Sequence, residues 1–357
     1  MKIGLIGLKQ SGKTTIFNAL TGQEAETGFG ANKLQVNMGN VKVPDTRLDV
    51  LTDIFNPKRK VNATVEYVDV AGVEGEGSID PALVNQIKVT DALLVVVRAF
   101  NDEGVFHPFN SVDPMRDLQN LMEEFIISDQ VIVENRIKRI EKQVKVSKNP
   151  QEKKEFETLL KIREALENLT PLREVEFDHL ELKQIRGFQF LTLKPILVVF
   201  NTDEGDDGRK FLDEFEKEYG RNQSVKAVAI SGKIEEEISR LEDEDKEMFM
   251  EEYGIKTLAR DLIIKESYSL LGLISFFTVG EDECRAWTIK EGTNAQKAAG
   301  AIHSDIERGF IRAEVVHYDD FVQEKSLAKC KEKGLLRLEG KDYIVKDGDI
   351  INFRFNV

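Results

Sequence analysis

The sequence predicts an α/β fold that carries an inserted helical hairpin and a small α+β domain, because three patterns follow one another along the chain. Short apolar runs alternate with polar helical stretches up to residue 97 and return at residue 195, as in the strands of a sheet covered by helices. A Glu-, Lys- and Leu-rich stretch without glycine separates these two parts. Short strands, one helix and turns follow from residue 276.

Five apolar runs are the candidate strands of one mostly parallel sheet. Each run fits a strand that is buried on both faces. They are Ile3–Ile6, Thr64–Val68, Ala92–Val97, Pro195–Phe200 and Val225–Ile230.

The segment from residue 117 to residue 184 predicts two antiparallel helices. Its apolar residues recur at helical spacing on both sides of a break at Lys148–Pro150. These residues are Ile132, Ile137, Ile140, Val144, Phe156, Leu159, Leu160 and Leu166. We therefore expect a helical hairpin inserted in the α/β domain.

These patterns divide the chain into four expected segments. Residues 1–116 form the first part of the α/β domain, and residues 117–187 form the inserted antiparallel hairpin. Residues 188–274 form the second part of the α/β domain, and residues 275–357 form the small α+β domain.

The composition excludes several classes of protein. Lys and Arg number 50 against 64 Asp and Glu, which gives a net charge of −14 and opposes binding of the whole molecule to DNA or acidic membranes. No apolar run approaches the roughly 18 residues of a membrane-spanning helix. Cys284 and Cys330 are the only cysteines, so neither a disulfide framework nor a Cys/His zinc site is supported. The start, Met1–Gly7, enters a strand without the apolar segment of a signal peptide, so we expect a cytoplasmic protein.

A phosphate-binding loop is predicted where the first strand ends. Gly7–Thr14 matches Gly-x-x-x-x-Gly-Lys-Ser/Thr and lies between the strand Ile3–Ile6 and a helical stretch that starts at Thr15. The glycines let backbone N–H groups surround phosphate oxygens, Lys13 would reach the β- and γ-phosphates, and the Thr14 hydroxyl would bind Mg²⁺. The predicted phosphate-loop residues are Gly7, Leu8, Lys9, Gln10, Ser11, Gly12, Lys13, Thr14 and Thr15.

Asp69–Gly72 follows the second strand run and supplies two further groups. Asp69 would lie near Mg²⁺, and the Gly72 N–H would contact the γ-phosphate. The next residue, Val73, stands where many GTPases of the Ras type carry the glutamine that orients the attacking water. A valine cannot orient water, so hydrolysis needs another group or is slow.

Asn201–Glu204 follows the strand Pro195–Phe200, at the place where a GTPase carries Asn-Lys-x-Asp to read guanine. Thr202 and Glu204 replace the lysine and the aspartate. Adenine presents an acceptor at N1 instead of a donor, so the longer acid and the lost lysine favour a relaxed or altered base choice. The alternative is a polar loop that does not contact the base. The predicted residues on this side of the nucleotide are Asn201, Thr202, Glu204, Ser231 and Gly232.

These features together resemble the Obg-like ATPase (YchF) family of translation-factor-related P-loop GTPases, and the resemblance covers nearly the whole chain. It implies a Ras-like G domain of the P-loop NTPase fold with a coiled-coil insertion, and a C-terminal TGS domain of ubiquitin-like fold. It also implies Mg²⁺, a preference for ATP over GTP, and association with the ribosome or its large subunit. The matching stretches beyond the loops above are Val43–Asp49, Thr90–Ala92, Arg285–Ile289, His303–Asp305, Gly309–Val315, Leu338–Val345 and Phe353–Val357.

The resemblance also suggests a catalytic group. In this family a histidine on a flexible loop is thought to replace the missing glutamine, and His107 falls at the matching position. An imidazole can orient or deprotonate water near neutral pH. Without the resemblance, a lone loop histidine is more often merely solvated.

Three departures from the family pattern affect the catalytic switches. Gln10 replaces an asparagine that has been linked to a monovalent cation, so a dependence on K⁺ is not expected. Lys33 stands where a threonine should close on Mg²⁺, and the loop Val73–Ser78 is shorter than the family's glycine-rich loop. Nucleotide binding is therefore better supported than efficient hydrolysis.

Two functions are open at this stage. The first is a slow Mg²⁺-dependent nucleoside triphosphatase, and the second is a nearly inactive module that binds a ribosomal or RNA partner in a nucleotide-dependent way. Basic clusters are candidates for contact with RNA, although such clusters are often solvated helix faces paired with acidic residues. They are Lys58–Lys60; Arg136, Lys138, Arg139, Lys142 and Lys145; and Lys325, Lys329, Lys331 and Lys333.

Overall fold

A computed structural model describes residues 1–25, 36–74, 79–146, 149–252 and 258–356. The chain forms two compact units. The first unit comprises Met1–Gly39 and Glu66–Arg260, and the second comprises Asn40–Val65 and Asp261–Val357. Among the described residues, no helix combines the length and the apolar character that crossing a membrane requires.

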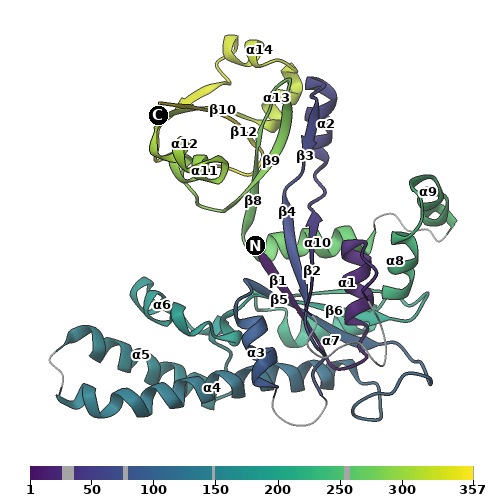
Figure 1. Cartoon of the computed structure of the whole chain (residues 1–357), viewed down its shortest axis with the longest axis vertical. Coiled ribbons are helices and arrows are strands. Elements are labelled where there is room, and N and C mark those ends of the chain that lie inside the picture. The colour runs from purple at the N-terminus through teal and green to yellow at the C-terminus, as the bar shows by residue number, and fades with distance from the viewer. Residues whose placement is uncertain (26–35, 75–78, 147–148, 253–257, 357) are drawn as a thin grey trace. The chain divides into compact units, whose positions relative to one another are not determined.

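The first unit is built around a six-stranded sheet in the order β2-β4-β1-β5-β6-β7 (Figure 1). The pairs β1–β4, β1–β5, β5–β6 and β6–β7 are all parallel, which confirms the predicted α/β sheet. Every residue of β5 is buried, and such continuous burial explains its unbroken apolar sequence. The strands are β1 Lys2–Ile6, β2 Asn37–Lys42, β4 Thr64–Asp69, β5 Ala92–Ala99, β6 Ile196–Thr202 and β7 Val225–Ile230.

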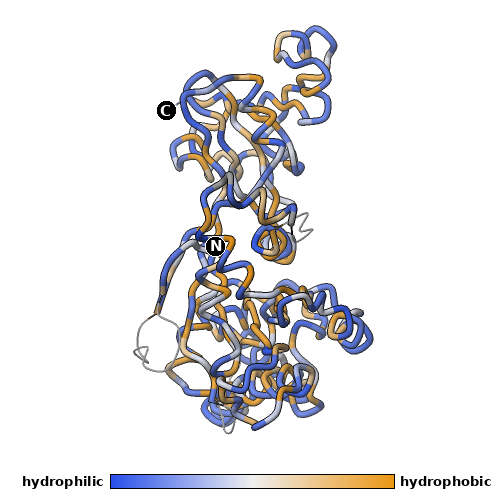
Figure 2. The backbone as a smooth tube through the Cα atoms, turned by 90° about the vertical axis from the view of Figure 1, so that its right-hand side faces the viewer, coloured by the Kyte–Doolittle hydropathy of each residue, from blue (hydrophilic) through white to orange (hydrophobic). Residues whose placement is uncertain are grey.

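Helices accompany this sheet, and all of them except Asp243–Glu252 contain buried apolar residues within the described part of the chain. Figure 2 shows hydrophobic and hydrophilic residues alternating along them, as orange and blue segments of the tube. Because all the neighbouring pairs from β4 to β7 are parallel, the loops that follow these strands meet at one edge of the sheet. The helices are α1 Lys13–Thr21, α3 Pro81–Lys88, α7 Arg209–Tyr219, α8 Gly232–Ser239 and α9 Asp243–Glu252.

The inserted hairpin consists of α4 Pro114–Val146 and α5 Pro150–Glu167 (Figure 1). The two helices share one apolar core with the segment that returns to the sheet, which confirms the predicted hairpin. The Asn149 side chain caps α5 by accepting the Gln151 N–H, and Pro150 occupies the first turn, a favoured start for a helix. Short helices complete the return: η1 Leu172–Glu174, α6 His179–Ile185, η2 Arg186–Phe188 and η3 Leu191–Leu193.

The second unit is a mixed sheet in the order β11-β10-β12-β8-β9-β3. Strand β10 is antiparallel to both β11 and β12, whereas β8 is parallel to β12. The strands are β3 Arg59–Val61, β8 Leu273–Thr278, β9 Glu283–Lys290, β10 Phe310–His317, β11 Arg337–Glu339 and β12 Asp349–Phe355. The helices are α2 Thr46–Phe55, α10 Ala259–Leu270, α11 Ala295–Ile302, α12 Ser304–Arg308, α13 Tyr318–Glu324 and α14 Leu327–Glu332. This α+β architecture was predicted, and the TGS assignment stays a prediction.

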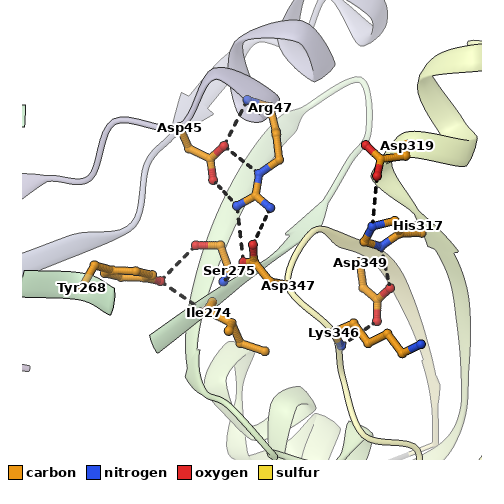
Figure 3. Close-up of polar contacts among 10 residues, drawn as sticks. All are labelled: Asp45, Arg47, Tyr268, Ile274, Ser275, His317, Asp319, Lys346, Asp347 and Asp349. Atoms are coloured by element: carbon orange, nitrogen blue, oxygen red, sulfur yellow. Dashed lines mark hydrogen bonds and ion pairs between the residues drawn. The ribbon is translucent and has the colours of Figure 1, made fainter. Parts of the chain in front are cut away.

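Residues 40–65 belong to the second unit, although the predicted boundaries place them within the first domain segment. Strand β3 pairs in parallel with β9, and the ring of Phe55 stacks on Phe321 with centroids 5.3 Å apart. The Arg47 guanidinium donates to Asp347 at 2.7 Å (Figure 3). These contacts join segments that are more than 200 residues apart, so no local sequence pattern could indicate them. The predicted domain boundaries stay predictions.

Candidate nucleotide-binding site

The phosphate loop runs from the end of β1 to the start of α1 and needs its two glycines for different reasons. Gly12 caps α1 with a φ of 86°, a left-handed conformation that favours glycine. A Cβ atom on Gly7 would lie 2.3 Å from the Val96 carbonyl oxygen, and one on Gly12 would lie 2.1 Å from Asn201 Nδ2. The loop is therefore packed so tightly that neither position accepts a side chain.

Lys13, Thr14 and Asp69 meet at the N-terminal end of α1. The Thr14 hydroxyl donates to Asp69 Oδ2 at 3.1 Å. Burial lowers the pKa of Lys13, and the nearby Asp69 carboxylate partly opposes that shift. Among the described residues, no group donates a hydrogen bond to the buried Asp69 Oδ1. A hydroxyl and a carboxylate oxygen are ligands that Mg²⁺ accepts, and the orphaned oxygen fits a metal ion or its bound water.

The segment after Asp69 is hydrogen-bonded directly to the phosphate loop. The Val73 N–H donates to the Gly7 carbonyl at 2.9 Å, and the Lys9 N–H donates to the Val73 carbonyl at 2.9 Å. The Lys9 ammonium also pairs with Glu74. A Cβ on Gly72 would lie 3.0 Å from Lys9 Cα, so Gly72 permits this close approach. The Lys9 N–H is thus engaged by Val73.

Two predicted features of the switches cannot be placed. Lys33 and the end of the shortened loop, residues 75–78, lie outside the residues that the structure describes. Val73 is 5 % exposed, and its side chain is part of the apolar core. It therefore packs as a core residue and offers no group to a water molecule.

Asn201 joins the phosphate loop to the loop after β7. Its Nδ2 donates to the Ser11 carbonyl at 3.1 Å, and its Oδ1 accepts the Gly232 N–H at 2.9 Å. Thr202 is buried, and its hydroxyl donates to the Asp206 carbonyl at 3.0 Å. Glu204 is exposed. Of the replaced pair, only Glu204 thus has a side chain in solvent.

Three buried polar atoms in this region lack a described partner. Ser11 Oγ, Asp69 Oδ1 and Ser231 Oγ have no hydrogen-bond partner within the part of the chain that the structure describes. A buried polar group without a partner is costly, and such groups usually mark a site that water or a ligand completes. All three belong to residues predicted from the sequence to contact nucleotide or metal.

His107 does not lie in solvent, as a typical loop histidine would, and its two ring nitrogens are both occupied. The side chain is 6 % exposed. Nε2 lies 2.9 Å from Asp117 Oδ2, and Nδ1 accepts the Phe109 N–H at 3.1 Å. In this arrangement the ring has no free lone pair for a water molecule.

Arg98 holds the loop before His107, and sequence reasoning missed it. Its guanidinium donates to the carbonyls of Phe100 at 3.1 Å, Asp102 at 3.1 Å and Val105 at 2.9 Å. Asp203, inside the predicted base-reading motif, accepts the Asn101 N–H at 3.1 Å. An arginine at the end of an otherwise apolar strand was the available signal.

The basic clusters predicted as candidate RNA contacts carry acidic partners. Lys58 pairs with Asp282 at 2.7 Å, Arg59 with Glu283 at 3.6 Å, and Lys60 with Asp49. Arg136 pairs with Glu155 at 2.7 Å, and Lys333 with Glu324 at 2.6 Å. The side chain of Lys145 lies outside the described residues. Much of the positive charge in these clusters is therefore neutralised within the chain.

Two family models match the chain. The model described as "50S ribosome-binding GTPase" matches residues 2–136. The model YchF-GTPase_C, described as a protein of unknown function (DUF933), matches residues 273–356. The two models therefore cover the phosphate loop and the C-terminal sheet.

Curated relatives match over their full length. The chain is 43% identical to the "Ribosome-binding ATPase YchF" of Bacillus subtilis, with 99% of each chain covered. It is 41% identical to the protein of the same name from Haemophilus ducreyi, with 100% of this chain and 99% of the relative covered. The solved structure of the Schizosaccharomyces pombe YchF GTPase superposes with a TM-score of 0.86 at 29% identity, covering 99% of this chain and 97% of that one.

Proposed function

The chain belongs to the YchF family, and from that premise we propose that it is a slow Mg²⁺-dependent nucleoside triphosphatase that prefers ATP to GTP. We also propose that it associates with the ribosome or its large subunit, because its curated relatives are named ribosome-binding ATPases. The single observation that carries the enzymatic part is a set of buried oxygens without a described partner, in the phosphate loop, at the end of β4 and after β7. Association with the ribosome also implies a cytoplasmic location.

Phosphate binding rests on the loop Gly7–Thr14 and on the dipole of α1. Lys13 supplies a positive charge; its burial lowers its pKa, and the Asp69 carboxylate partly opposes that shift. The Thr14 hydroxyl and the Asp69 carboxylate would hold Mg²⁺, which neutralises phosphate charge when it is bound. Ser11 Oγ and the Gly72 N–H complete the residues that face the phosphates in this proposal.

The preference for ATP rests on the loop Asn201–Glu204. Asn201 acts within the protein, because it joins two loops that contact the nucleotide in this proposal. Thr202 turns into its own loop and provides no lysine stem to cover the base. Glu204 is exposed and longer than the aspartate that reads guanine. Ser231 Oγ, buried without a described partner, is available to a polar atom of the base.

Water activation is assigned to His107, because Val73 is a core residue and cannot perform it. In this structure the imidazole is turned to Asp117 and to the Phe109 N–H. His107 must therefore give up the Phe109 N–H before its Nδ1 can accept a proton from water, and in this proposal the ring also leaves Asp117 to reach the nucleotide. This requirement gives a physical reason for slow turnover.

Three measurements test this proposal. Calorimetry on nucleotide-free protein with Mg²⁺ should show tighter binding of ATP than of GTP, and each factor of ten corresponds to about 1.4 kcal/mol. Equal affinities, or tighter GTP, would remove the ATP preference and keep the phosphate site. Lys13→Ala should abolish turnover, and steady turnover that survives this substitution would contradict the enzymatic assignment. Replacing K⁺ with Na⁺ should not change the rate.

A second function is favoured by the same histidine. If His107 stays engaged when nucleotide is bound, the protein is a nucleotide-gated binding module with almost no hydrolysis. A single-turnover experiment separates the two functions. A negligible rate of ATP cleavage, measured beside firm nucleotide binding, would favour the module over the enzyme.

A further inference from the structure

Asp117 lies in the first turn of α4 and is buried beside the histidine. Its side chain is 3 % exposed, and its two oxygens have different partners. Oδ2 faces His107 Nε2 at 2.9 Å. Oδ1 accepts hydrogen bonds from Arg116 Nη2 at 2.7 Å and Nε at 3.0 Å. The carboxylate is thus held in one orientation by Arg116 and offers its other oxygen to the imidazole.

The two contacts of His107 define which nitrogen carries the proton. A backbone N–H can only donate, so Nδ1 must present its lone pair to Phe109. Nε2 must then carry the proton and donate it to Asp117. This tautomer uses every polar atom of the ring inside the protein.

The turn around His107 is braced from a second side. Arg116 also donates to the Ser111 carbonyl at 2.7 Å, and its guanidinium lies over the ring of Phe109 at 5.0 Å. Arg98 binds the carbonyls of the preceding loop as far as Val105. The loop is consequently anchored at both ends of the segment that carries the histidine, and its release needs a local rotation of residues 106–110.

We propose that Asp117 is a positioning residue. It holds the His107 ring in the orientation seen here, and the strength of this contact sets how often the imidazole reaches the nucleotide. The proposal rests on the proposed function, in which His107 activates water. In the orientation held by Asp117, the Nε2 proton is donated to Asp117 and the Nδ1 lone pair accepts the Phe109 N–H. The ring therefore neither contacts a phosphate nor accepts a proton from water. Weakening the bond to Asp117 raises the population of the released ring and hence the rate of hydrolysis.

The first experiment compares single-turnover ATP cleavage in the wild type and in Asp117→Asn. The amide keeps the size of the side chain and replaces a bond to a charged oxygen with a weaker neutral one. Cleavage should become several-fold faster, up to on the order of tenfold, with ATP affinity unchanged. The gain should vanish in the double variant His107→Ala/Asp117→Asn. Glu103→Gln, which removes a charge from an exposed side chain of the same loop, should leave the rate unchanged.

A rate in Asp117→Asn that is unchanged, or that falls to the rate of His107→Ala, overturns the proposal, provided that the variant shows wild-type circular dichroism. A gain that persists in the double variant overturns it as well, because the effect would not pass through His107.

The second experiment observes the ring directly and does not depend on activity. The chain has four histidines, so imidazole ¹⁵N signals can be assigned to His107 by comparison with His107→Ala. The nucleotide-free wild type should show the Nε2–H tautomer, and Asp117→Asn should shift His107 toward a tautomer mixture. If the wild type shows the Nδ1–H tautomer, or an average of the two tautomers, the orientation held by Asp117 is overturned. If the wild type cleaves no ATP at all, the enzymatic assignment fails while the tautomer still decides the role of Asp117.

Discussion

The nucleotide-site region of the first unit and the Arg47 network of the second unit differ in how completely the protein itself satisfies their polar groups. In the first, a serine hydroxyl after β7, a serine hydroxyl in the phosphate loop and one oxygen of Asp69 are buried without a partner among the described residues. In the second, defined here as Asp45, Arg47, Ser275 and Asp347, donors and acceptors face one another (Figure 3).

The Arg47 network is completed by the protein alone. The Arg47 guanidinium donates to both Asp45 and Asp347, and these two carboxylates raise its pKa despite partial burial. Asp347 also accepts the Ser275 N–H at 2.8 Å. Close by in sequence, the fully buried Asp349 accepts the Tyr343 hydroxyl at 2.8 Å and the Lys346 N–H at 2.9 Å. Polar groups of this kind specify one packing of the fold.

The difference distinguishes residues whose hydrogen bonding a ligand would complete from residues whose hydrogen bonds stabilise the folded chain. Incomplete hydrogen bonding lowers the stability of the free protein, and a bound nucleotide and metal would offset this loss by supplying the missing partners. Complete hydrogen bonding contributes to stability at all times. The same chemical substitution should therefore change function in one region and stability in the other.

Asp69→Asn should have the largest effect. It removes the carboxylate that we assign to Mg²⁺, so Mg²⁺-supported ATP cleavage should fall by about a hundredfold, the usual scale for losing one preorganised electrostatic contact. The free energy of unfolding of the nucleotide-free protein should change little, because Asp69 Oδ1 has no described partner to lose and an amide oxygen can still accept the Thr14 hydroxyl. Only the attraction between Asp69 and the Lys13 ammonium is lost. Measurement of cleavage rates against Mg²⁺ concentration, beside urea denaturation, checks both parts. Strong destabilisation with retained Mg²⁺ dependence would make Asp69 a structural residue and break the comparison.

Asp347→Asn is the matched change in the Arg47 network. It removes one charged acceptor of Arg47 and keeps an oxygen for the Ser275 N–H. Because the Asp347 side chain is about half exposed, at 49 %, solvent screens the pair and the free energy of unfolding should fall by about 1 kcal/mol. ATP affinity should not change. Denaturation of Asp347→Asn, Arg47→Met and the double variant measures the coupling between the two side chains. A coupling near zero would show that the pair contributes nothing and that the network is held by Asp45 alone.

Asp129 tests whether complete hydrogen bonding is enough to offset the burial of a carboxylate. It is fully buried and accepts three hydrogen bonds from η3: the Leu191 N–H, the Thr192 N–H and the Thr192 hydroxyl. Burial still raises its pKa to about 6. Its folded pKa exceeds the unfolded value, so the folded state binds the proton more tightly and stability is lost as pH rises toward and through 6.

The wild type should therefore gain about 1.4 kcal/mol of unfolding free energy between pH 7.5 and pH 5, relative to Asp129→Asn, which cannot titrate there. Urea denaturation of both proteins at the two pH values measures this difference. A flat difference between pH 5 and pH 7.5 would mean that the three donors keep the Asp129 pKa near its ordinary range, and that hydrogen bonds alone offset its burial.

Sequence patterns predicted the parts of this molecule that depend on local periodicity. The buried strands and the hairpin followed from apolar spacing, and the proximity of Thr14 and Asp69 followed from two motifs that both assign a residue to Mg²⁺. Asp117 and Arg98 could not be assigned in this way. Their importance lies in partners that a chain turn brings together, and a carboxylate or guanidinium in an apolar stretch does not reveal which carbonyl or imidazole it will meet.

The smallest expected effect concerns the surface cluster Lys58–Lys60. Lys58 and Asp282 form an ion pair in which both side chains are about four-fifths exposed, at 79 % and 82 %, so solvent screens the attraction. Lys58→Ala should change the free energy of unfolding by less than about 0.5 kcal/mol, and co-sedimentation with ribosomes should be unaltered. Asp282→Ala is the control, because it frees the lysine while leaving its charge. Stronger sedimentation in Asp282→Ala and weaker sedimentation in Lys58→Ala would instead assign the cluster Lys58–Lys60 to a contact with RNA phosphates, since unmasking and removing one positive charge would act in opposite directions.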